Sequence, residues 1–539
     1  MNDVTSGMEE QFDYVVVGGG TAGCIVAARL SENPSVRVLL LEAGPKSAGN
    51  IWTYVPVGYY KNVYNPEVTF QYLTEPDPNI RNRQIPWAKG RVLGGSSAIN
   101  GLTHLRGKPD DYDNWAAMGN RGWSYREVLP YFKKFEKYEK GESEFHGASG
   151  PIGVRPMRNP NPICDAFVEG GKQMGLPFIP DLNSDLHEGV GIYQLCIKDW
   201  RRSSSADHIA QAARRQNLVV RVNCRVNRIL LEGKKAVGVE YTGRDSRVHK
   251  VGAGREVVLS GGAISSPQLL ELSGIGDAAR LSALGIPVVQ NLPGVGENLI
   301  DHYQVRSAYK CSLARTMNDI NASFLKQCVE GVKYVFGQAG VATVGAGQAG
   351  AFMRSDPNGP VDMEITFMNF TTDGPGRPPH PFSAFTIVGF QQQPESRGRV
   401  HIKSTDPGEN PAMVANYLSA EKDRKVVVAA LKAGRRFAAT PALSKYILEE
   451  FKPGRDVRTD EEILEYARSQ GGTVFHLSST CRMGADPLAV VDDRLSVHGV
   501  AHLRIVDASV MPTSVSSNIC AAVMMIGEKA ADMIREDAK

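Results

Sequence analysis

A histidine and an asparagine near the end of the sequence have side chains suited to removing a proton from a hydroxyl group. His476 lies in Gly471-Gly-Thr-Val-Phe-His-Leu-Ser-Ser-Thr-Cys-Arg-Met-Gly484, and Asn518 follows in Ser-Ser-Asn-Ile-Cys. Imidazole has an ordinary pKa of about 6.5, and a neighbouring amide can hydrogen-bond a developing alkoxide. Such a pair would suit the oxidation of an alcohol to a carbonyl. Spacing alone leaves a second interpretation open, in which His476 is one structural histidine of eleven and Asn518 caps a helix.

Alcohol oxidation also needs a hydride acceptor, and the N-terminal segment predicts a dinucleotide-binding turn. An apolar strand from Phe12 to Val17 runs into Gly-x-Gly-x-x-Gly and then into a helical pattern. The glycines allow a tight turn, close approach to a pyrophosphate and helix–strand packing, while the helix N-terminus offers free N–H groups to the phosphates. The expected cofactor contacts are Gly18, Gly20, Thr21, Ala22 and Gly23. A purely structural glycine turn is the alternative.

A second apolar strand, Val36 to Leu41, ends in an acidic residue. Glu42, followed by Ala43, stands where a carboxylate can bind the two hydroxyls of a ribose. An acidic residue at this point disfavours a 2′-phosphate, so NADP is an improbable ligand.

Three later segments favour a long cofactor such as FAD over NAD. They are Lys89 to Asn100, Gly262 to Gly276, and Leu503 to Pro512. The first two are rich in small residues, as expected where backbone runs close to a flat group, and contacts from both ends of the chain imply a long ligand. The cofactor contacts expected here are Arg91, Gly94, Gly95, Ser96, Asn100, Gly101, Asp507 and Ala508.

The same segments resemble signatures of the glucose–methanol–choline (GMC) oxidoreductase family. Gly90 to Asn100 is similar to its first signature and Gly262 to Gly276 to its second; Gly294 to His302 and Pro394 to Val400 also match family blocks. The resemblance extends from about Phe12 to Met533, and is greatest to bacterial choline-dehydrogenase-like alcohol oxidases and dehydrogenases.

The resemblance implies roles for several residues. His476 and Asn518 match the family's catalytic histidine and its partner. Asn100 should lie near the flavin ring and Ala508 near the pyrophosphate. Val226, at the end of a strand predicted from Leu218 to Val226, should contact the adenine through its backbone. Some members attach FAD through a histidine just before the signature asparagine. This chain has Ile99 there, which implies non-covalent FAD. His104 departs from the family pattern, and we expect it to be a packed or solvated side chain rather than a substrate contact.

A helix should begin near Asn518, because residues 519–534 have helical composition and no proline. If its N-terminus points at the flavin pyrimidine, its dipole stabilises the anion of reduced flavin. We therefore expect the Ile519 N–H to face the flavin O2.

The fold class expected is α/β, α+β overall, with two discontinuous domains. Residues 11–155, 215–305 and 475–539 should form a Rossmann-like FAD-binding domain, and 156–214 and 306–474 an antiparallel-sheet substrate domain. Strand-like alternation appears in 362–370 and 383–391. The loop between them, 371–379, is a candidate lid or a plain surface loop. Phe367, Asn369 and Gln391 are candidate pocket residues, and Val474 is expected near the flavin.

Composition excludes several other classes. With 61 basic and 58 acidic residues the net charge is only +3, which disfavours a nucleic-acid partner. The first eleven residues are polar, no stretch is long and apolar enough for a transmembrane helix, and eight scattered cysteines fit neither a disulfide framework nor a metal site. We expect a cytoplasmic protein, with peripheral membrane contact left open.

Function at this stage is FAD-dependent oxidation of a small alcohol, primary and aliphatic or aromatic. The electron acceptor is open between oxygen, a quinone and another molecule, as is the oligomeric state. The alternative is a hydroxynitrile-lyase-type member of the family without net redox chemistry.

Overall fold

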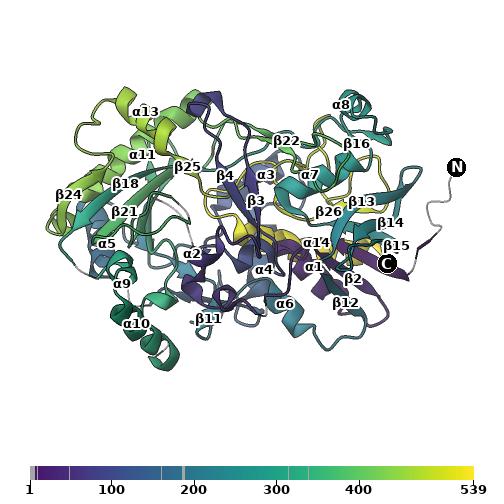
Figure 1. Cartoon of the computed structure of the whole chain (residues 1–539), viewed down its shortest axis with the longest axis horizontal. Helices are drawn as coiled ribbons and strands as arrows, with labels where there is room; N and C mark the ends of the chain where they lie inside the picture. The colour runs from purple at the N-terminus through teal and green to yellow at the C-terminus, as the bar shows by residue number, and fades with distance from the viewer. Residues whose placement is uncertain are drawn as a thin grey trace.

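Two β-sheets lie on opposite sides of the computed structural model, and helices from both ends of the chain pack between and around them (Figure 1). The structure describes residues 7–8, 10–47, 49–158, 161–184, 188–313, 315–337, 339–374 and 376–539. Most of the N-terminal segment for which a polar character is expected therefore lies outside the described residues, as does Pro375 of the candidate lid.

The first sheet has a parallel centre built on the apolar N-terminal strand. Its order is β12-β2-β1-β15-β14-β13, and β26 pairs with β15. The strands are β1 Glu10–Val17, β2 Val38–Glu42, β12 Leu218–Val222, β13 Arg225–Glu232, β14 Lys235–Thr242, β15 Val248–Leu259 and β26 Leu503–Ile505. β1 runs parallel to both β2 and β15, as expected for a doubly wound dinucleotide fold.

The stretch from Leu218 to Val226, which the sequence suggests is one strand, is two strands. β12 ends at Val222 and β13 starts at Arg225, because Asn223 has a positive φ of 57° that breaks the extended backbone. β12 is parallel to β2, whereas β13 is antiparallel to β14.

The two chain ends meet through a pair of helices. α1 (Thr21–Leu30) follows the glycine turn and packs against α14 (Cys520–Asp537), the C-terminal helix. The start of α14 confirms the helix expected near Asn518. Gly527 lies over Ala22 and lets the two helices approach closely, since a Cβ there would stand 3.2 Å from the Ala22 backbone.

The second sheet is antiparallel, with the order β24-β18-β21-β20-β19-β8, and β25 pairs with β18. Its strands are β8 Gly189–Ile192, β18 Tyr303–Cys311, β19 Ala349–Arg354, β20 Val361–Met368, β21 Ala384–Gln391, β24 Ile447–Lys452 and β25 Gly472–Thr473. β20 and β21 confirm the two predicted strands. The long helix α11 (Glu421–Ala439) packs on β21, β18 and β20. The antiparallel second sheet agrees with the expected architecture, while the domain boundaries stay a prediction.

The remaining elements connect and cover the two sheets. The other helices are α2 Tyr59–Asn62, α3 Pro109–Ala117, α4 Tyr125–Phe135, α5 Pro162–Gln173, α6 Ala206–Gln211, α7 Gly262–Leu272, α8 Ala278–Ala283, α9 Met317–Asn321, α10 Phe324–Gly337, α12 Pro441–Ser444 and α13 Asp460–Gln470. The other strands are β3 Thr69–Leu73, β4 Pro86–Gly90, β5 Thr103–His104, β6 Glu136–Tyr138, β7 Ile152–Pro156, β9 Gln194–Leu195, β10 Ile197–Lys198, β11 Arg201–Arg202, β16 Ile275–Gly276, β17 Gln290–Asn291, β22 Arg399–His401 and β23 Ala412–Val414.

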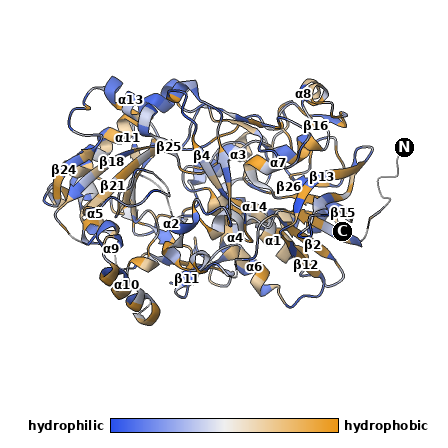
Figure 2. Ribbon diagram, in the orientation of Figure 1, coloured by the Kyte–Doolittle hydropathy of each residue, from blue (hydrophilic) through white to orange (hydrophobic). Residues whose placement is uncertain are grey.

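No helix in the described part of the chain is long and apolar enough to cross a membrane. All eight cysteines are free thiols. Most apolar residues are in the interior, but α10 projects from the body and carries hydrophobic residues on its outer face (Figures 1 and 2).

The glycine turn gives a stability prediction. A Cβ at Gly23 would stand 2.0 Å from the Gly18 carbonyl oxygen, which is backbone and cannot move aside. Gly23→Ala should therefore lower the free energy of unfolding by about 1–3 kcal/mol, the usual cost of overpacking. Thermal and denaturant unfolding measure this.

Gly331→Ala in α10 is the matched control, since no other residue lies within 4 Å of its Cβ position. It should leave stability unchanged or raise it, because alanine favours a helix over glycine. Equal stability of Gly23→Ala and the parent would contradict the packing argument.

Candidate active site

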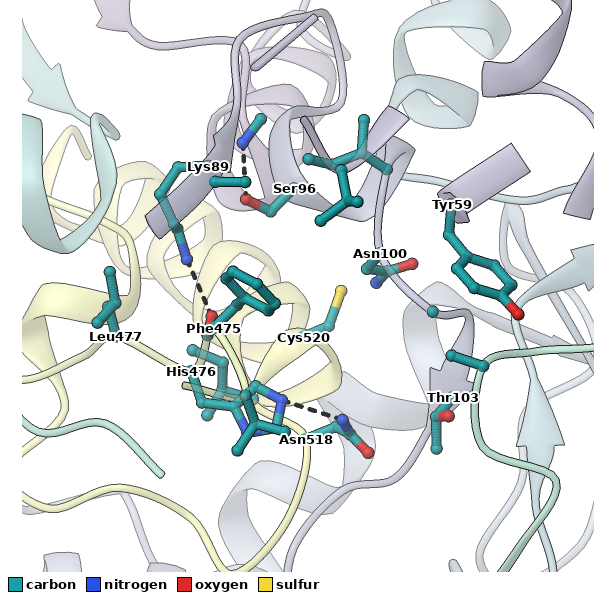
Figure 3. Close-up of a pocket in the computed structure, with 18 of the residues that line it drawn as sticks. Tyr59, Lys89, Ser96, Asn100, Thr103, Phe475, His476, Leu477, Asn518 and Cys520 are labelled. Carbon is teal, nitrogen blue, oxygen red and sulfur yellow. Dashed lines mark hydrogen bonds between the residues drawn. The ribbon is translucent and has the colours of Figure 1, made fainter. Parts of the chain in front are cut away.

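A deep pocket lies between the two sheets and receives residues from both. Its volume is about 360 Å³. His476, Asn518 and Val474 all line it, as predicted for residues that face a common ligand. Figure 3 shows the two catalytic candidates side by side at one edge, with Asn100, Thr103 and Cys520 across the space from them.

Most of the cofactor residues predicted from sequence surround this pocket or the smaller hollow next to it. The predicted residues that line the main pocket are Gly20, Thr21, Ala22, Gly95, Ser96, Asn100, Gly101, Asp507, Ala508 and Ile519. Those that line the adjoining hollow are Gly18, Glu42, Ala43 and Val226, with Gly20 common to both.

Three predicted contacts line neither space. Gly23 is enclosed between Gly18 and Ser260 and serves packing. Gly94 donates its backbone N–H to the Gly19 carbonyl, with a φ of 95°. Arg91 donates to the Pro66 carbonyl and lies over the Phe70 ring, so its side chain is held on the outside of the turn.

His476 is held on three sides. Its backbone N–H donates to Asp301 at 2.8 Å, its Nδ1 lies 2.8 Å from the Nδ1 of His302, and the Nδ2 of Asn518 lies 3.0 Å from its Nε2. The side chain is buried except where it borders the pocket. The histidine that the sequence singles out is therefore fixed in one orientation.

The hydrogen-bond partners determine which nitrogen of His476 carries a proton. The Nε2 of His302 lies 2.8 Å from the carbonyl oxygen of Gln392, which can only accept, so Nε2 must be the donor. In a neutral His302 the Nδ1 is then an acceptor, and the His476 Nδ1–H donates to it. This leaves the Nε2 of His476 as a lone pair facing the pocket, where the amide of Asn518 donates to it.

Burial keeps both imidazoles neutral. Desolvation lowers the pKa of His302 to about 4. Desolvation, with smaller repulsion from His302 and Lys89, lowers the pKa of His476 well below its ordinary value. A neutral His476 is the form that can accept a proton.

Asp301 anchors the loop that carries His476. It accepts hydrogen bonds from the hydroxyls of Tyr417 and Thr473 in addition to the His476 N–H, and burial raises its pKa to about 6. The loop reaches His476 through Phe475, whose φ is 66° and whose carbonyl accepts from Lys89 (Figure 3).

Sequence reasoning did not assign roles to Asp301 and His302, although it singled out the block from Gly294 to His302. An adjacent Asp-His pair in a glycine-rich block was the available signal. Its link to His476 depends on the pairing of β18 with β25, which no sequence spacing reveals.

Two uncapped helix starts fit a dinucleotide. The N-cap of α1 is Gly20, which has no side chain, and that of α14 is Ile519, whose side chain cannot accept a hydrogen bond, so neither helix start is capped by a side chain. Both residues line the pocket, so free backbone N–H groups and positive helix ends face it. Gly18 and Gly95 keep the turn thin, since a Cβ on either would collide with backbone. The residues present therefore fit FAD.

Glu42 has partners that the sequence did not predict. Its Oε2 accepts from the Gly19 N–H at 2.8 Å and its Oε1 from the Gly44 N–H at 2.7 Å. Burial raises its pKa to about 7. Each oxygen keeps a second lone pair, so the carboxylate both closes the turn and borders the hollow.

The prediction that Phe367, Asn369 and Gln391 line the pocket was wrong. Phe367 packs in the core against Phe167 and Phe385, and none of the three borders the cavity. Both strands are largely buried on both faces, so alternation did not reveal which face was open. The lining residues have the opposite parity and are Glu364, Thr366, Met368, Phe370, Val388 and Phe390.

Two further predictions concern the pocket's surroundings. Thr372 and Gly376, from the loop at 371–379, line the pocket, while His104 does not. The His104 ring is buried, 3.3 Å from Glu136 and edge-on to Phe135. His104 is thus a packed histidine, as expected.

Comparison with known proteins gives matches over nearly the whole chain. The N-terminal sequence profile of the GMC oxidoreductases matches residues 12–304, and the C-terminal profile matches residues 394–527. Mitochondrial choline dehydrogenase of Mus musculus is 38% identical over 542 residues, 99% of this chain and 91% of the relative. The oxygen-dependent choline dehydrogenase of Escherichia coli O127:H6 is 39% identical over 536 residues, 97% of this chain and 96% of the relative.

Solved structures agree. Pyridoxine 4-oxidase from Mesorbium loti superposes with a TM-score of 0.88 at 31% identity, covering 97% of this chain and 99% of the other. A formate oxidase variant from Aspergillus oryzae RIB40 superposes with a TM-score of 0.91 at 26% identity, covering 99% of each chain.

The two-histidine arrangement gives a prediction. His302→Leu removes the acceptor for the His476 Nδ1–H, so it should slow reduction of the bound cofactor by an alcohol about 10–100-fold, the cost of one unpaired buried donor. His302→Gln can donate to the Gln392 carbonyl and accept from His476, and should recover most of the rate. Anaerobic rapid mixing measures both. Equal rates for the leucine variant and the parent would contradict the arrangement.

Proposed function

The chain belongs to the GMC oxidoreductase family, and from that premise we propose that it oxidises a primary alcohol, aliphatic or aromatic, to the aldehyde. Its cofactor is FAD, and it is an enzyme that acts on the CH–OH group of its donors. The observation that carries the proposal is the unprotonated Nε2 of a neutral His476, which accepts from Asn518 at the edge of a pocket that also receives the cofactor segments.

His476 is the base in this proposal. The alcohol hydroxyl displaces the Asn518 amide from the lone pair of the His476 Nε2, donates to it and loses its proton there, while the Nδ1–H stays bonded to His302. The Asn518 amide, 3.0 Å from Nε2, donates to the substrate oxygen as negative charge develops. Bound FAD would supply the hydride acceptor for the carbinol carbon.

His302 acts as a hydrogen-bond acceptor for His476 and does not act as a second base. Because its own Nε2–H is committed to the Gln392 carbonyl, it can stabilise the imidazolium of His476 without taking its proton. Asp301 fixes the backbone at the same point. Together they keep the base oriented at little cost in entropy when the substrate arrives.

We propose the same cofactor contacts that the sequence predicts. We assign the pyrophosphate to the α1 start with Gly18, Gly20 and nearby Ala508, and the ribose to Glu42. Val226 is assigned to the adenine, and Asn100 to the flavin ring. The uncapped start of α14 supports the assignment of the Ile519 N–H to the flavin O2. We propose non-covalent FAD, because Ile99 offers no nucleophile.

Residues 306–474, with 156–214, are proposed as the substrate domain, and the remainder of 11–539 as the FAD domain. A cytoplasmic location is supported by free cysteines. The electron acceptor is oxygen, a quinone or another molecule. The relatives described above are named as dehydrogenases and oxidases, so nothing favours the lyase alternative.

His476→Ala tests the proposal most simply. The variant should keep yellow FAD, because His476 is not among the proposed cofactor contacts, yet its flavin should be reduced by an alcohol about 10²–10⁴-fold more slowly, the usual value of a general base. Loss of flavin absorbance after anaerobic mixing is the measurement.

His498→Ala is a matched control, since His498 bonds the Gly484 carbonyl outside the pocket. It should reduce its flavin at the parent rate. Parent-like reduction in the His476 variant would end the assignment.

A further inference from the structure

Arg306, on the second sheet, lines the pocket and has no counter-ion among the described residues. Arg306 lies on β18 with Gln304, and both line the cavity. Its Nε donates to the Gln304 Oε1 at 3.2 Å. Among the described residues, no carboxylate lies within ion-pair distance of the guanidinium, and its two terminal nitrogens have no hydrogen-bond partner.

Arg306 is half-buried and lines the cavity. Of the more deeply buried arginines, Arg106 and Arg504 bind the carboxylates of Glu136 and Glu256 at 2.7 Å, whereas Arg155 and Arg202 have no carboxylate partner among the described residues and donate to backbone carbonyls. In the part of the chain that the structure describes, the guanidinium of Arg306 has only the Gln304 side chain as a partner. Burial lowers the pKa of Arg306, because desolvation disfavours its charged form. A guanidinium stays charged nevertheless, so it carries a desolvation cost that an anion would offset.

The register of the sheet locates this charge relative to the base. His302, Gln304 and Arg306 follow one another at two-residue steps, and Gln304 pairs with Phe390 while Arg306 pairs with Val388. Each step is about 6.6 Å along a strand. The backbone of Arg306 therefore lies two steps from that of His302, which contacts His476. The hydrogen bond to Gln304 directs the Arg306 side chain back towards His302.

The cofactor phosphates are not the natural partner of this charge. They are assigned to the α1 start on the first sheet, whereas Arg306 belongs to the second. Glu364 is not its partner either. It pairs with Phe390 two strands away from Gln304, and the hydroxyls of Tyr193 and Ser517 donate to it.

We propose that Arg306 binds a carboxylate carried by the alcohol substrate. The inference rests on the proposed function and narrows its substrate class. Phe390, Val388, Met368 and Phe370 line the space between or beside the two polar ends, so the spacer is apolar or aromatic. A hydroxymethyl group and a carboxylate on opposite sides of a benzene ring have the required form. A guanidinium fork matches a carboxylate with two hydrogen bonds.

The test compares two probes that differ only in charge. With FAD-loaded enzyme, 4-(hydroxymethyl)benzoate should be oxidised with a kcat/KM about 10–100-fold above that of 4-(hydroxymethyl)benzamide, the value of a charge-assisted pair. Arg306→Gln should abolish the preference through KM, with the limiting rate of flavin bleaching kept, and Arg306→Lys should restore part of it. Benzoate binding, followed by perturbation of the flavin spectrum, should weaken by the same factor.

Equal kcat/KM for the two probes in the parent would overturn the proposal, as would an equal loss for both probes in Arg306→Gln. Benzyl alcohol separates this outcome from failure of the proposed function. If benzyl alcohol bleaches the flavin in the parent and not in His476→Ala, the oxidation stands whatever the result at Arg306.

An independent observation concerns the outer surface of α10. Its large apolar side chains are exposed, with Phe324 at 82%, Leu325 at 73%, Val335 at 67% and Phe336 at 84%. Tyr334 is buried, and its hydroxyl donates to the Trp200 carbonyl. The helix thus turns the side of Tyr334 to the body and its apolar side to solvent, the reverse of an ordinary surface helix (Figure 2).

The sequence of α10 makes the exposed side a single stripe. At 100° per residue, Phe324, Leu325, Cys328, Val329, Val332, Val335 and Phe336 fall within one arc of about 140°, opposite Glu330 and Tyr334. The exposed Lys326 and Lys333 border this arc on one side. Lysines beside an apolar stripe with aromatic ends are typical of helices that lie in a membrane interface.

We propose that α10 docks the protein on an anionic phospholipid surface. A second copy of the chain is the weaker occupant: fourteen residues form a helix about 21 Å long, whose apolar face offers roughly 300 Å² against about 800 Å² per partner in a stable complex. A bilayer needs no matching partner surface, and its anionic headgroups complement Lys326, which has no ion pair among the described residues, while Lys333 pairs with Glu330 at 2.6 Å.

Co-sedimentation with vesicles of phosphatidylcholine and phosphatidylglycerol tests the docking surface. The holoenzyme should bind these vesicles, more weakly at high salt, and Leu325→Glu with Val335→Glu should bind at least tenfold more weakly with FAD content and activity unchanged. Leu488→Glu is the control, because Leu488 is half exposed in a loop beside Gly294. Absence of vesicle binding by the parent, an equal loss in the control, or conversion of a dimer to a monomer by the α10 changes would overturn the proposal.

Discussion

The carbonyl oxygen of Gln392 determines the protonation of the whole site. It can only accept, so the imidazole of His302 must donate to it and must present a lone pair to His476. His476 then keeps its proton on Nδ1 and turns an unprotonated Nε2 to the pocket. One backbone group, just after the end of β21, thus selects the tautomer of His476 in which Nδ1 carries the proton and Nε2 is the base.

This arrangement requires segments far apart in the sequence to meet at one place. β18 brings His302 alongside the loop of His476 through its pairing with β25, and the packing of α14 on α1 brings Asn518 to the same edge. The uncapped starts of those two helices then face the pocket together. The same packing that joins the chain ends supplies both the cofactor-facing surface and the amide partner of the base, so fold and site are not separable.

Much of this could be predicted from the sequence because the glycine turn, the strand before it and the signature blocks each constrain the backbone locally. These features predicted the dinucleotide-binding sheet, the start of the last helix and the location of His476 and Asn518 at a common pocket. Contacts between distant strands did not: the role of His302 depends on strand pairing, and Asn223 broke an apparently continuous strand. The face of β20 that borders the cavity was also predicted wrongly, because apolar residues such as Phe367 and Met368 lie on both faces of the strand, and only packing on the α11 side decides which face borders the cavity.

The strand that carries the link to the base also carries the charge proposed to bind the substrate. Arg306 lies two strand steps beyond His302 on the same face, so a single strand presents the link to the base and a recognition charge in sequence. The central claim, a neutral His476 with its proton on Nδ1, is tested most directly by neutron crystallography of the deuterium-exchanged holoenzyme. Nuclear density for deuterium is expected on the His476 Nδ1 and on the His302 Nε2, and none on the His476 Nε2. Deuterium on the His476 Nε2 would contradict it.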